Sequence, residues 1–390
     1  MDCSYNQLSS LNVSGCACLE KLDCSYNQLS SLDISGLKSL EKLDFNNNQM
    51  QDFNLSKCEN IRDLSIKGNP GISVKISDCA SLNSTRFSGE ELTLLHISKC
   101  PNLPACNIDL SQILSLELSD LSTDYDELQL GKNIKSLTIS NWKGLRRIVC
   151  SESQLESLII SNCPDLLELE CEHNLLTELS TSGFPNLKSL SCWDNLIQSL
   201  DVSGLTNLTN LGCGGNPIKY LDVSGLTNLT NLTCGTKTLK SIDASSTGLL
   251  NFSYGGLADG IALTLQELNL SNCKDLKYLS VTGLELEKIN ITGCSSLEQA
   301  YLSNNNLTSL DIAGCNSLSR LDCEKNKIIQ LITPEFEGVL FKCDWLYYYY
   351  HVPWKDNIPC GIKYDINDYG WYYSNEPDGR AGEIHKQYHD

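Results

Sequence analysis

Apolar and polar residues alternate along this chain in a unit of 21 residues that recurs many times. Residues 187–207 read LKSLSCWDNLIQSLDVSGLTN, and residues 208–228 read LTNLGCGGNPIKYLDVSGLTN. Each unit holds two short segments with a period of two, such as Leu190-x-Cys192 and Leu200-x-Val202. A period of two is typical of β-strands. We therefore expect two strands of about three residues per unit, each pairing in parallel with its copies about 4.8 Å away in neighbouring units.

One apolar position, in the second predicted strand, shows how far the repeat extends. It recurs every 21 residues from Val13 to Ala244 and resumes after a five-residue slip at Leu270, Ile291 and Ile312. A fixed period of this length is the signature of a solenoid. The predicted fold is a predominantly β repeat solenoid of about fifteen coils over residues 1–332, irregular over 85–155 and with an insertion near 245–265.

The unit L-x-x-L-x-C-x-x-N-x-L-x-x-L-x-V-S-x-x-x-x resembles bacterial leucine-rich repeats, most closely the 21-residue class in which the L-x-x-L-x-L half is nested twice. In one coil the pattern positions hold Leu187, Leu190, Cys192, Asn195, Ile197, Leu200 and Val202. The resemblance implies a leucine-rich repeat solenoid of the surface or secreted type, which uses its repeat face for protein contact and adhesion. One solenoid fold hosts many partners, so the resemblance identifies no particular one.

A column of asparagines is the main polar feature of the repeat. It comprises Asn6, Asn27, Asn48, Asn69, Asn174, Asn195, Asn216, Asn305 and Asn326. An amide in an inward turn both donates and accepts, so we expect these residues to satisfy backbone groups of neighbouring coils that are costly to bury without partners. The column is lost at Glu90, Ser111, Lys132 and Ser153. We interpret that stretch as degenerate scaffold; a surface reshaped by a partner is the alternative.

Many of the 20 cysteines also lie in columns with the 21-residue spacing. The columns are Cys150, Cys171, Cys192, Cys213 and Cys234; Cys58, Cys79 and Cys100; and Cys273, Cys294 and Cys315. Cysteine replaces leucine at these positions, and we expect it to pack as a small buried hydrophobic residue with its thiol reduced. Disulfides between coils and metal ligation are the alternatives. Metal is disfavoured because no column of histidines accompanies the cysteines.

The formal net charge of −19 would repel the phosphates of a nucleic acid, so we do not expect non-specific nucleic-acid binding. The same charge favours basic protein partners. No apolar run of 18 residues occurs, so no membrane insertion is expected. No signal peptide is recognised. Met1 lies in the middle of a repeat, without a cap, which predicts a fragment of a longer protein. We expect an extracellular or bacterial cell-surface location, with the cytoplasm as the alternative.

Residues 333–390 lack the repeat and contain 14 of the 28 aromatic residues of the chain. Residues 362–373 alternate as a β-hairpin does, with a turn at 367–370. We expect a small aromatic-rich β cap that covers the open end of the core. The alternative is an aromatic platform that binds a sugar or a peptide.

Candidate chemistry is sparse. Four potential zinc ligands, whose spacing matches no established template, are Cys343, Cys360, His385 and His389. Residues 365–370 carry calcium-type oxygen ligands out of the usual register. No G-x-S-x-G, H-E-x-x-H or P-loop motif occurs. We therefore predict no enzyme activity, no cofactor and no metal.

The predicted function is that of a monomeric, non-enzymatic module that binds a basic protein ligand on its repeat face. The expected contact residues occupy outward positions of the first strand or of the two residues after it: Asp23, Tyr26, Asp44, Glu170, His173, Trp193, Asp194 and Tyr301. Exposed aromatics beside carboxylates are typical of interface hot spots. The alternative is that these eight residues are ordinary solvent-exposed positions that vary from coil to coil of a scaffold and bind nothing. The alternative functions are assembly through open solenoid ends and carbohydrate or peptide binding by the C-terminal segment.

Overall fold

The computed structural model describes residues 1–87, 92–103, 113–121, 126–236, 238–254, 265–332, 340–342 and 363–364. The described residues form short strands joined by turns and contain no helix. The paired strands are all parallel, and most partners lie one repeat apart in the sequence. The chain is therefore a parallel β-solenoid, which confirms the predicted fold class. It divides into two compact units, Met1–Leu208 and Thr209–Asp390.

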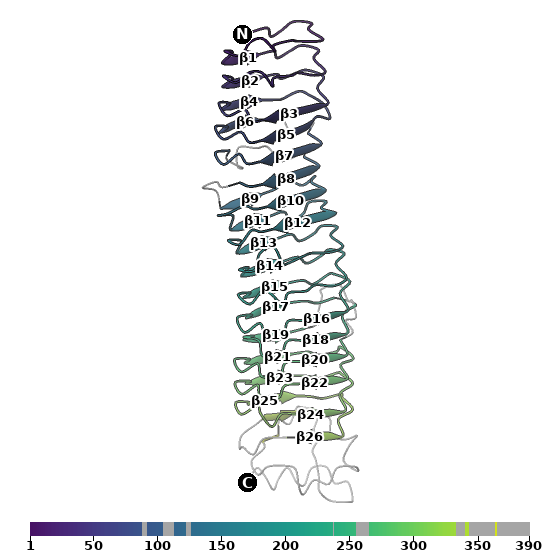
Figure 1. Cartoon of the computed structure of the whole chain (residues 1–390). Coiled ribbons are helices and arrows are strands. Elements are labelled where there is room, and N and C mark those ends of the chain that lie inside the picture. The colour runs from purple at the N-terminus through teal and green to yellow at the C-terminus, as the bar shows by residue number, and fades with distance from the viewer. Residues whose placement is uncertain are drawn as a thin grey trace, which may run out of the picture. The chain divides into compact units, whose positions relative to one another are not determined.

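The first strands of the first unit lie along one side of its stack of coils (Figure 1). They are β1 (Lys21–Asp23), β2 (Lys42–Asp44), β4 (Asp63–Ser65) and β6 (Ser84–Arg86), which pair in this order, and β9 (Glu127–Gln129), β11 (Arg147–Val149), β13 (Glu168–Glu170) and β14 (Ser189–Ser191), which do the same. In most of these strands the central apolar residue is buried and its two neighbours are at least partly exposed; β6 has Thr85 at its centre, and in β4 Ser65 is buried as well. Three residues per strand are thus enough to bury one side chain and present two.

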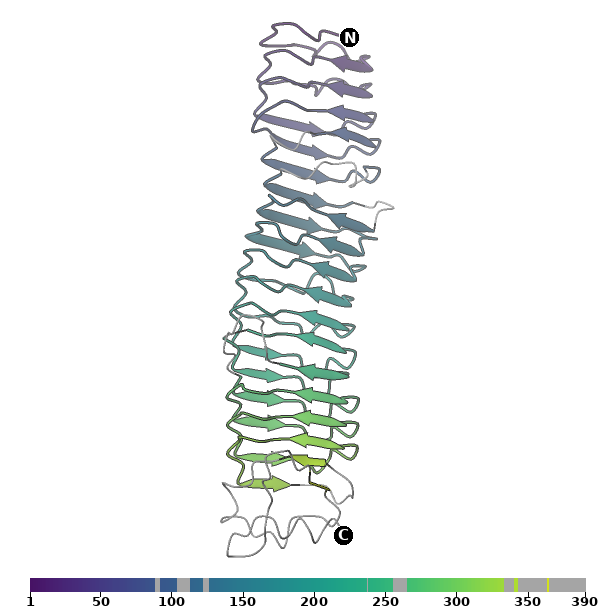
Figure 2. The same ribbon diagram turned by 180° about the vertical axis from the view of Figure 1, so that it is seen from behind.

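The second strands of the first unit form one six-stranded sheet on the opposite side (Figure 2). They are β3 (Asp52–Ser56), β5 (Ser73–Ser77), β7 (Leu94–Ser98), β8 (Ser115–Ser119), β10 (Ser136–Ser140) and β12 (Ser157–Ser161). Each is five residues long and buries two apolar side chains, as Val74 and Ile76 do in β5. The register is strictly 21 residues, for example between Ile76 and Ile97. Four of these strands lie within 85–161, so the coils there keep full second strands although the asparagine column is lost.

The second unit repeats the same plan. Its first strands are β15 (Asn210–Gly212), β17 (Asn231–Thr233), β19 (Asn251–Ser253), β21 (Tyr278–Ser280), β23 (Gln299–Tyr301), β25 (Arg320–Asp322), β27 (Leu340–Lys342) and β28 (Lys363–Tyr364). Its second strands are β16 (Tyr220–Asp222), β18 (Ser241–Asp243), β20 (Glu267–Asn269), β22 (Lys288–Asn290), β24 (Ser309–Asp311) and β26 (Gln330–Ile332). The register between β18 and β20 joins Ser241 to Glu267, a longer step than that between Tyr220 and Ser241.

The core lies between the two kinds of strand and is filled by the predicted columns. The column that contains Val13, Ile97 and Val223 is buried wherever it is apolar, with exposed fractions of 5% or less. Most of the cysteine columns are also buried; Cys150, Cys171 and Cys192 have an exposed fraction of 0%. The described cysteines form no disulfide. The prediction that cysteine packs in the core is confirmed.

Several expected second strands are missing among the described residues: the segments at Val13 and Ile34 form only an isolated bridge, and the segments at Thr181 and Val202 belong to no strand. Leu200 and Val202 are buried as predicted but belong to no strand. The apolar residue of the preceding coil is here Thr181, whose hydroxyl donates to the backbone carbonyl of Asp201 at 2.8 Å. In a regular coil the equivalent carbonyl accepts a hydrogen bond from the backbone N–H of the preceding coil. Val223 N, for example, donates to Asp243 O at 2.8 Å. The Thr181 hydroxyl thus takes the place of a backbone N–H as the hydrogen-bond donor between these two coils.

Of the C-terminal segment, the structure describes only the backbone of β27 and β28, which pair in parallel. The predicted cap over 333–390, the partner strand of the predicted hairpin and the potential zinc ligands Cys343, Cys360, His385 and His389 lie outside the described residues.

Candidate functional site

The outward side chains of the first strands and of the turn after each strand form a surface that we call the first-strand face. Neighbouring coils are in register here, so residues 21 apart form columns, as Asp23 and Asp44 do between β1 and β2. The coil spacing of about 4.8 Å brings successive members of a column within reach of each other. A short sequence motif therefore becomes a line of adjacent side chains on this face.

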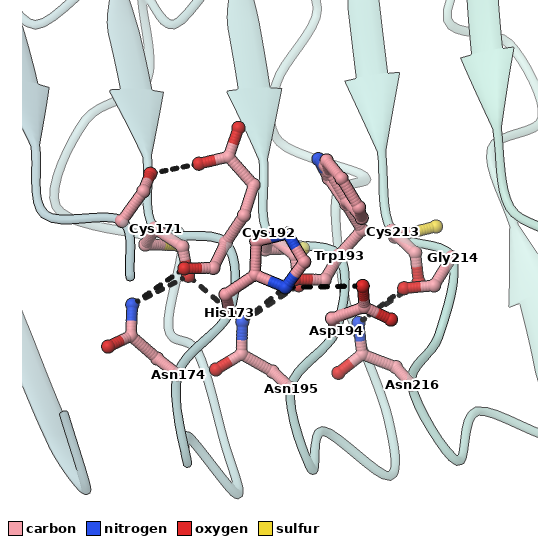
Figure 3. Close-up of polar contacts among 12 residues, drawn as sticks. Cys171, His173, Asn174, Cys192, Trp193, Asp194, Asn195, Cys213, Gly214 and Asn216 are labelled. Atoms are coloured by element: carbon pink, nitrogen blue, oxygen red, sulfur yellow. Dashed lines mark hydrogen bonds and ion pairs between the residues drawn. The ribbon is translucent and has the colours of Figure 1, made fainter. Parts of the chain in front are cut away.

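The asparagine column fixes the turn that ends each first strand. Asn48 Nδ2 donates to Phe45 O at 3.0 Å within its own coil and to Cys24 O at 3.1 Å in the preceding coil. Its Oδ1 accepts from the backbone N–H of Leu29 at 2.9 Å. Asn174 and Asn195 make the same bonds and lie in line beside Cys171 and Cys192 (Figure 3). The predicted role of this column is confirmed, and it leaves the residues before each Asn to point outward.

The residue immediately before each Asn adopts a left-handed backbone conformation. Its φ is 53° at Tyr26, 53° at Asn47, 52° at His173 and 52° at Asp194, and glycine occupies the position at Gly68 with φ 71°. Gly and Asn enter this region most easily, whereas a bulky side chain there is uncommon. Long side chains also occupy this position, at Glu152 and Lys325, so the fold accepts residues of several sizes there. Aromatic rings at Tyr26 and His173 are not required by the scaffold.

Three of the predicted contact residues meet on two adjacent coils of the first unit. His173 Nδ1 lies 3.3 Å from Asp194 Oδ2. The imidazole also contacts the indole of Trp193, with ring centroids 4.5 Å apart and planes inclined at 65° (Figure 3). Trp193 remains 40% exposed. The cluster thus combines a partly exposed indole, an imidazole and a carboxylate on a rigid pair of turns.

Glu170, a fourth predicted contact residue, is engaged in an ion network on the same face. Its Oε1 accepts from Arg147 Nη2 at 2.7 Å, while Glu127 and Glu168 lie 3.1 and 3.4 Å from the same guanidinium. Hydrogen bonding by Glu170 raises the pKa of Arg147 above its ordinary value. Three carboxylates around one cation leave this part of the face negatively charged.

Asp23, Tyr26 and Asp44 lie near the start of the first unit. The ring of Tyr26 stacks on that of Tyr5, with centroids 4.2 Å apart and planes inclined at 9°. Asp23 Oδ1 accepts from Ser25 N and Ser25 Oγ at 3.0 and 2.6 Å, and Asp44 Oδ1 accepts from Asn46 N at 3.1 Å. Both aspartates therefore support the turn after their strand, a structural role that the sequence reading did not foresee. Burial raises the pKa of Asp44, and the neighbouring Asp23 charge adds to this effect.

Tyr301, the last predicted contact residue, belongs to the second unit and forms its own cluster. Its ring centroid lies 5.6 Å from that of Tyr278 and 5.2 Å from the guanidinium carbon of Arg320. Its hydroxyl lies 3.1 Å from Gln299 Oε1, within the same strand. Tyr301 is thus held between a ring and a cation that the chain itself supplies.

Two sets of residues on or beside the first-strand face of the first unit were missed. Tyr5 lies 21 residues before Tyr26, so the spacing could have found it. Arg147 lies 21 residues before Glu168, in a column that the sequence analysis did not single out. Leu175 and Leu196, which follow Asn174 and Asn195, are 47% and 49% exposed. Both occupy the variable position between the Asn and the apolar residue of the motif, so leucine at that outward position was the signal that could have found them.

The thiols do not form a metal centre among the residues that the structure describes, where no group of three or more His, Cys, Asp or Glu side chains is arranged to hold an ion. Burial raises the pKa of Cys24, Cys234, Cys294 and Cys315 to about 12. A metal ligand must be a thiolate, so burial of this kind opposes ligation. In the described part of the chain no helix is long and apolar enough to cross a membrane.

No protein-family model matches the chain, and no curated protein matches it significantly. Among solved structures it is similar to the functional domain of InlJ from Listeria monocytogenes, which includes a cysteine ladder, at 23% identity and a TM-score of 0.32, over 85% of this chain and 59% of that one. It is also similar to YopM, a leucine-rich effector protein from Yersinia pestis, at 20% identity and a TM-score of 0.31, over 85% and 78% of the two chains. A leucine-rich repeat protein of Leptospira interrogans shows 20% identity and a TM-score of 0.30, over 84% and 90%.

The similar structures named here come from bacteria, and the chain spans 59% of the length of the InlJ structure. At these identities and TM-scores the structural similarity alone assigns neither the fold nor the function of this chain. The class of the fold, a leucine-rich repeat solenoid, rests on the 21-residue motif, the parallel register of its strands and the buried asparagine turns.

Proposed function

We propose that this chain is a non-enzymatic protein-binding module and that the first-strand face of its first unit makes the contact. The resemblance of its repeat to bacterial leucine-rich repeats supports a place on the bacterial surface or outside the cell, in adhesion or a related contact. The acidic net charge of −19 supports a basic partner.

The observation that carries the proposal is the choice of residue at the left-handed position of the turn. Neighbouring coils use Asn47 and Gly68 there, and the conformation suits them. Tyr26 and His173 adopt the same conformation, which costs energy for a bulky L residue, and Glu152 and Lys325 do so in other coils. What distinguishes Tyr26 and His173 is the aromatic ring that each presents at this position. Strained positions of this kind cluster at binding sites, because the surrounding structure pays for a side chain that serves another purpose.

The rigidity of the solenoid supports the same function. Each outward side chain stands on a turn held by an asparagine that bonds to two coils, as Asn195 does for Trp193 and Asp194. Aromatic side chains have few rotatable bonds, so they lose little conformational entropy when a partner immobilises them. A rigid face with partly exposed Tyr26 and Trp193 is therefore preorganised for association.

A selection from a displayed random-peptide library tests the proposal. The double variant Tyr26→Asn and Trp193→Ser removes both aromatics, and asparagine is already the native residue at the position of Tyr26 in the next coil. The control, Lys75→Ser and Ile159→Ser, changes two exposed side chains on the second strands of the same unit. We expect the wild-type chain and the control to retain selected peptides and the first double variant to lose them. Equal retention by both variants would refute the first-strand face as the contact surface.

A further inference from the structure

Trp193, Leu175 and Leu196 are exposed apolar side chains on two adjacent coils, and the same coils carry the carboxylates of Glu168, Glu170 and Asp194; we call these residues the Trp193 patch. The indole contacts His173, and the turns of the same two coils carry the exposed leucines Leu175 and Leu196. A hydrophobic centre with a polar rim is the usual anatomy of a protein interface. Such a patch is large enough to seat one or two side chains of a partner.

The carboxylates of the Trp193 patch leave negative charge unbalanced. Asp194 Oδ2 faces His173 at 3.3 Å, while Asp194 Oδ1 has no partner among the residues that the structure describes. The side chain of Asp194 is 46% exposed. Nearby, Glu168 and Glu170 share the single guanidinium of Arg147, which Glu127 also contacts. The carboxylates here outnumber the cations, so a positively charged group of a partner would be attracted to this part of the face.

We propose that this patch binds the side chain of an arginine presented by the partner protein, with its guanidinium on the indole of Trp193 and paired to Asp194. This inference rests on the proposed function and names the chemistry that the partner must supply. The solenoid already holds the same kind of contact internally, because Arg320 lies over the ring of Tyr301 at 5.2 Å in the second unit.

Arginine fits the patch better than lysine for two reasons. A planar guanidinium stacks on an aromatic face and at the same time presents N–H groups at its edge to a carboxylate. A lysine ammonium is a compact, strongly hydrated charge that cannot do both with equal ease. The aliphatic part of the arginine side chain would lie along the apolar surface of Leu175 and Leu196.

A titration with short blocked peptides tests the inference. The probe is acetyl-Gly-Arg-Gly-amide, and the matched neutral control replaces arginine by citrulline, which has nearly the same shape. Binding is followed by NMR, through the shift of the indole N–H signal of Trp193, which is assigned by its loss in Trp193→Leu. We expect the arginine peptide to move this signal, the lysine peptide to move it less and the citrulline peptide to leave it in place.

Variants locate the effect. Asp194→Asn and Trp193→Leu are each expected to weaken binding of the arginine peptide by about two- to five-fold, the range for cation–π and ionic contacts at exposed sites. The Trp193→Leu titration uses neighbouring backbone amide signals instead of the indole. Asp52→Asn, on the exposed start of β3, removes the same amount of charge from the second-strand side and should leave the affinity unchanged.

Two outcomes would overturn the inference. Equal binding of the citrulline peptide would show that no cation is recognised, and an equal loss with Asp52→Asn would show only a general effect of net charge. Either result leaves the proposed function standing if selected peptides still require Tyr26 and Trp193. Loss of that requirement would instead remove the proposed function together with this inference.

Discussion

Asn48 Nδ2 donates to the backbone carbonyl of Cys24 at 3.1 Å, and this bond joins two successive coils of the first unit. The same side chain accepts from Leu29 N and donates to Phe45 O, so one amide satisfies three buried backbone groups. A coil of 21 residues with two strands of three to five residues cannot pair these groups within the ladders. The asparagine column therefore replaces the hydrogen bonds that the turns lack.

Replacing Asn48 by alanine should lower the free energy of unfolding of the first unit by about 2–4 kcal/mol, because several buried backbone groups lose their partners. Chemical denaturation followed by circular dichroism measures this change. The matched control is Asn6→Ala: Asn6 is exposed, and among the described residues its Nδ2 donates to Cys3 O and Ser4 O of its own coil and to no other coil. Its replacement should cost less than about 1 kcal/mol. Equal costs at the two positions would contradict the proposed bridging role.

The buried cysteines should be unreactive thiols in the native protein. In an in-register column the Cβ atoms are separated by the coil spacing, about 4.8 Å, whereas a disulfide needs about 3.8 Å. Ellman's reagent should therefore react quickly with Cys16 and Cys18, which are exposed, more slowly with the half-buried Cys3 and Cys58, and with the buried thiols only in denaturant.

The experiment is cleanest with Cys106, Cys343 and Cys360 replaced by serine, because these three lie outside the described residues. Adding Cys16→Ser and Cys18→Ser should then abolish the fast phase. A total thiol count in denaturant well below the number of remaining cysteines would show that the columns are oxidised and that the packing argument is wrong.

Much of this architecture follows from the sequence, because each repeat restates the same constraints. The two strands in most coils, the buried column from Val13 to Ile312 and the bonding of the asparagines were predicted from spacing alone, and the structure confirms them. Spacing works well here because the nearest neighbours of every residue in space are its copies one period away. The prediction of a strand was wrong at Thr181, which breaks the pattern, and also at Val13 and Ile34, which keep it but lie where only an isolated bridge forms.

The candidate site was harder to predict from the sequence than the fold, because it depends on where side chains point and what they contact. The period places Trp193 on an outward position but cannot give its contact with His173 or the exposure of Leu196. The turn-supporting bonds of Asp23 and Asp44 were missed because an acidic column looks the same whether its carboxylates bind a partner or their own backbone. Their role in binding a partner stays a prediction.

The buried thiols predict that the protein loses stability in alkali. The pKa of Cys294 in the folded chain is raised from 9.0 to about 12, mainly by burial. Its pKa in the folded state is above that in the unfolded state, so its contribution is fully present below pH 9 and is lost as the pH rises toward 12. In that window the unfolded chain ionises and the folded chain does not.

Denaturation of the wild-type chain at pH 7, 9 and 10.5 should show a free energy of unfolding that is already lower at pH 9, where the thiols of the unfolded chain are half ionised, and that falls further at pH 10.5. In Cys294→Ala the fall should be smaller, whatever the cost of the cavity at pH 7. The exposed Cys16 provides the control, and Cys16→Ala should fall as the wild type does. A fall of the same size in Cys294→Ala would contradict the assignment of the effect to buried thiols.

Asp44 should destabilise the folded protein at neutral pH, in contrast to Asp33. Burial and the nearby Asp23 raise the pKa of Asp44, whereas hydrogen bonding to Ser35 lowers the pKa of Asp33. A carboxyl group with a raised pKa contributes its stability below the unfolded value of 3.8 and loses it as the pH rises through the folded value.

At pH 7 the Asp44→Asn variant should therefore be more stable than the wild type, by up to about 1 kcal/mol for a partly exposed pair of like charges. The amide oxygen can still accept from Asn46 N, so the turn is kept. The difference should disappear at pH 3.5 in urea denaturation. The sign should reverse for Asp33→Asn, which removes a charged acceptor that the fold stabilises. A loss of stability at pH 7 in both variants would mean that the turn bond of Asp44 outweighs its repulsion from Asp23.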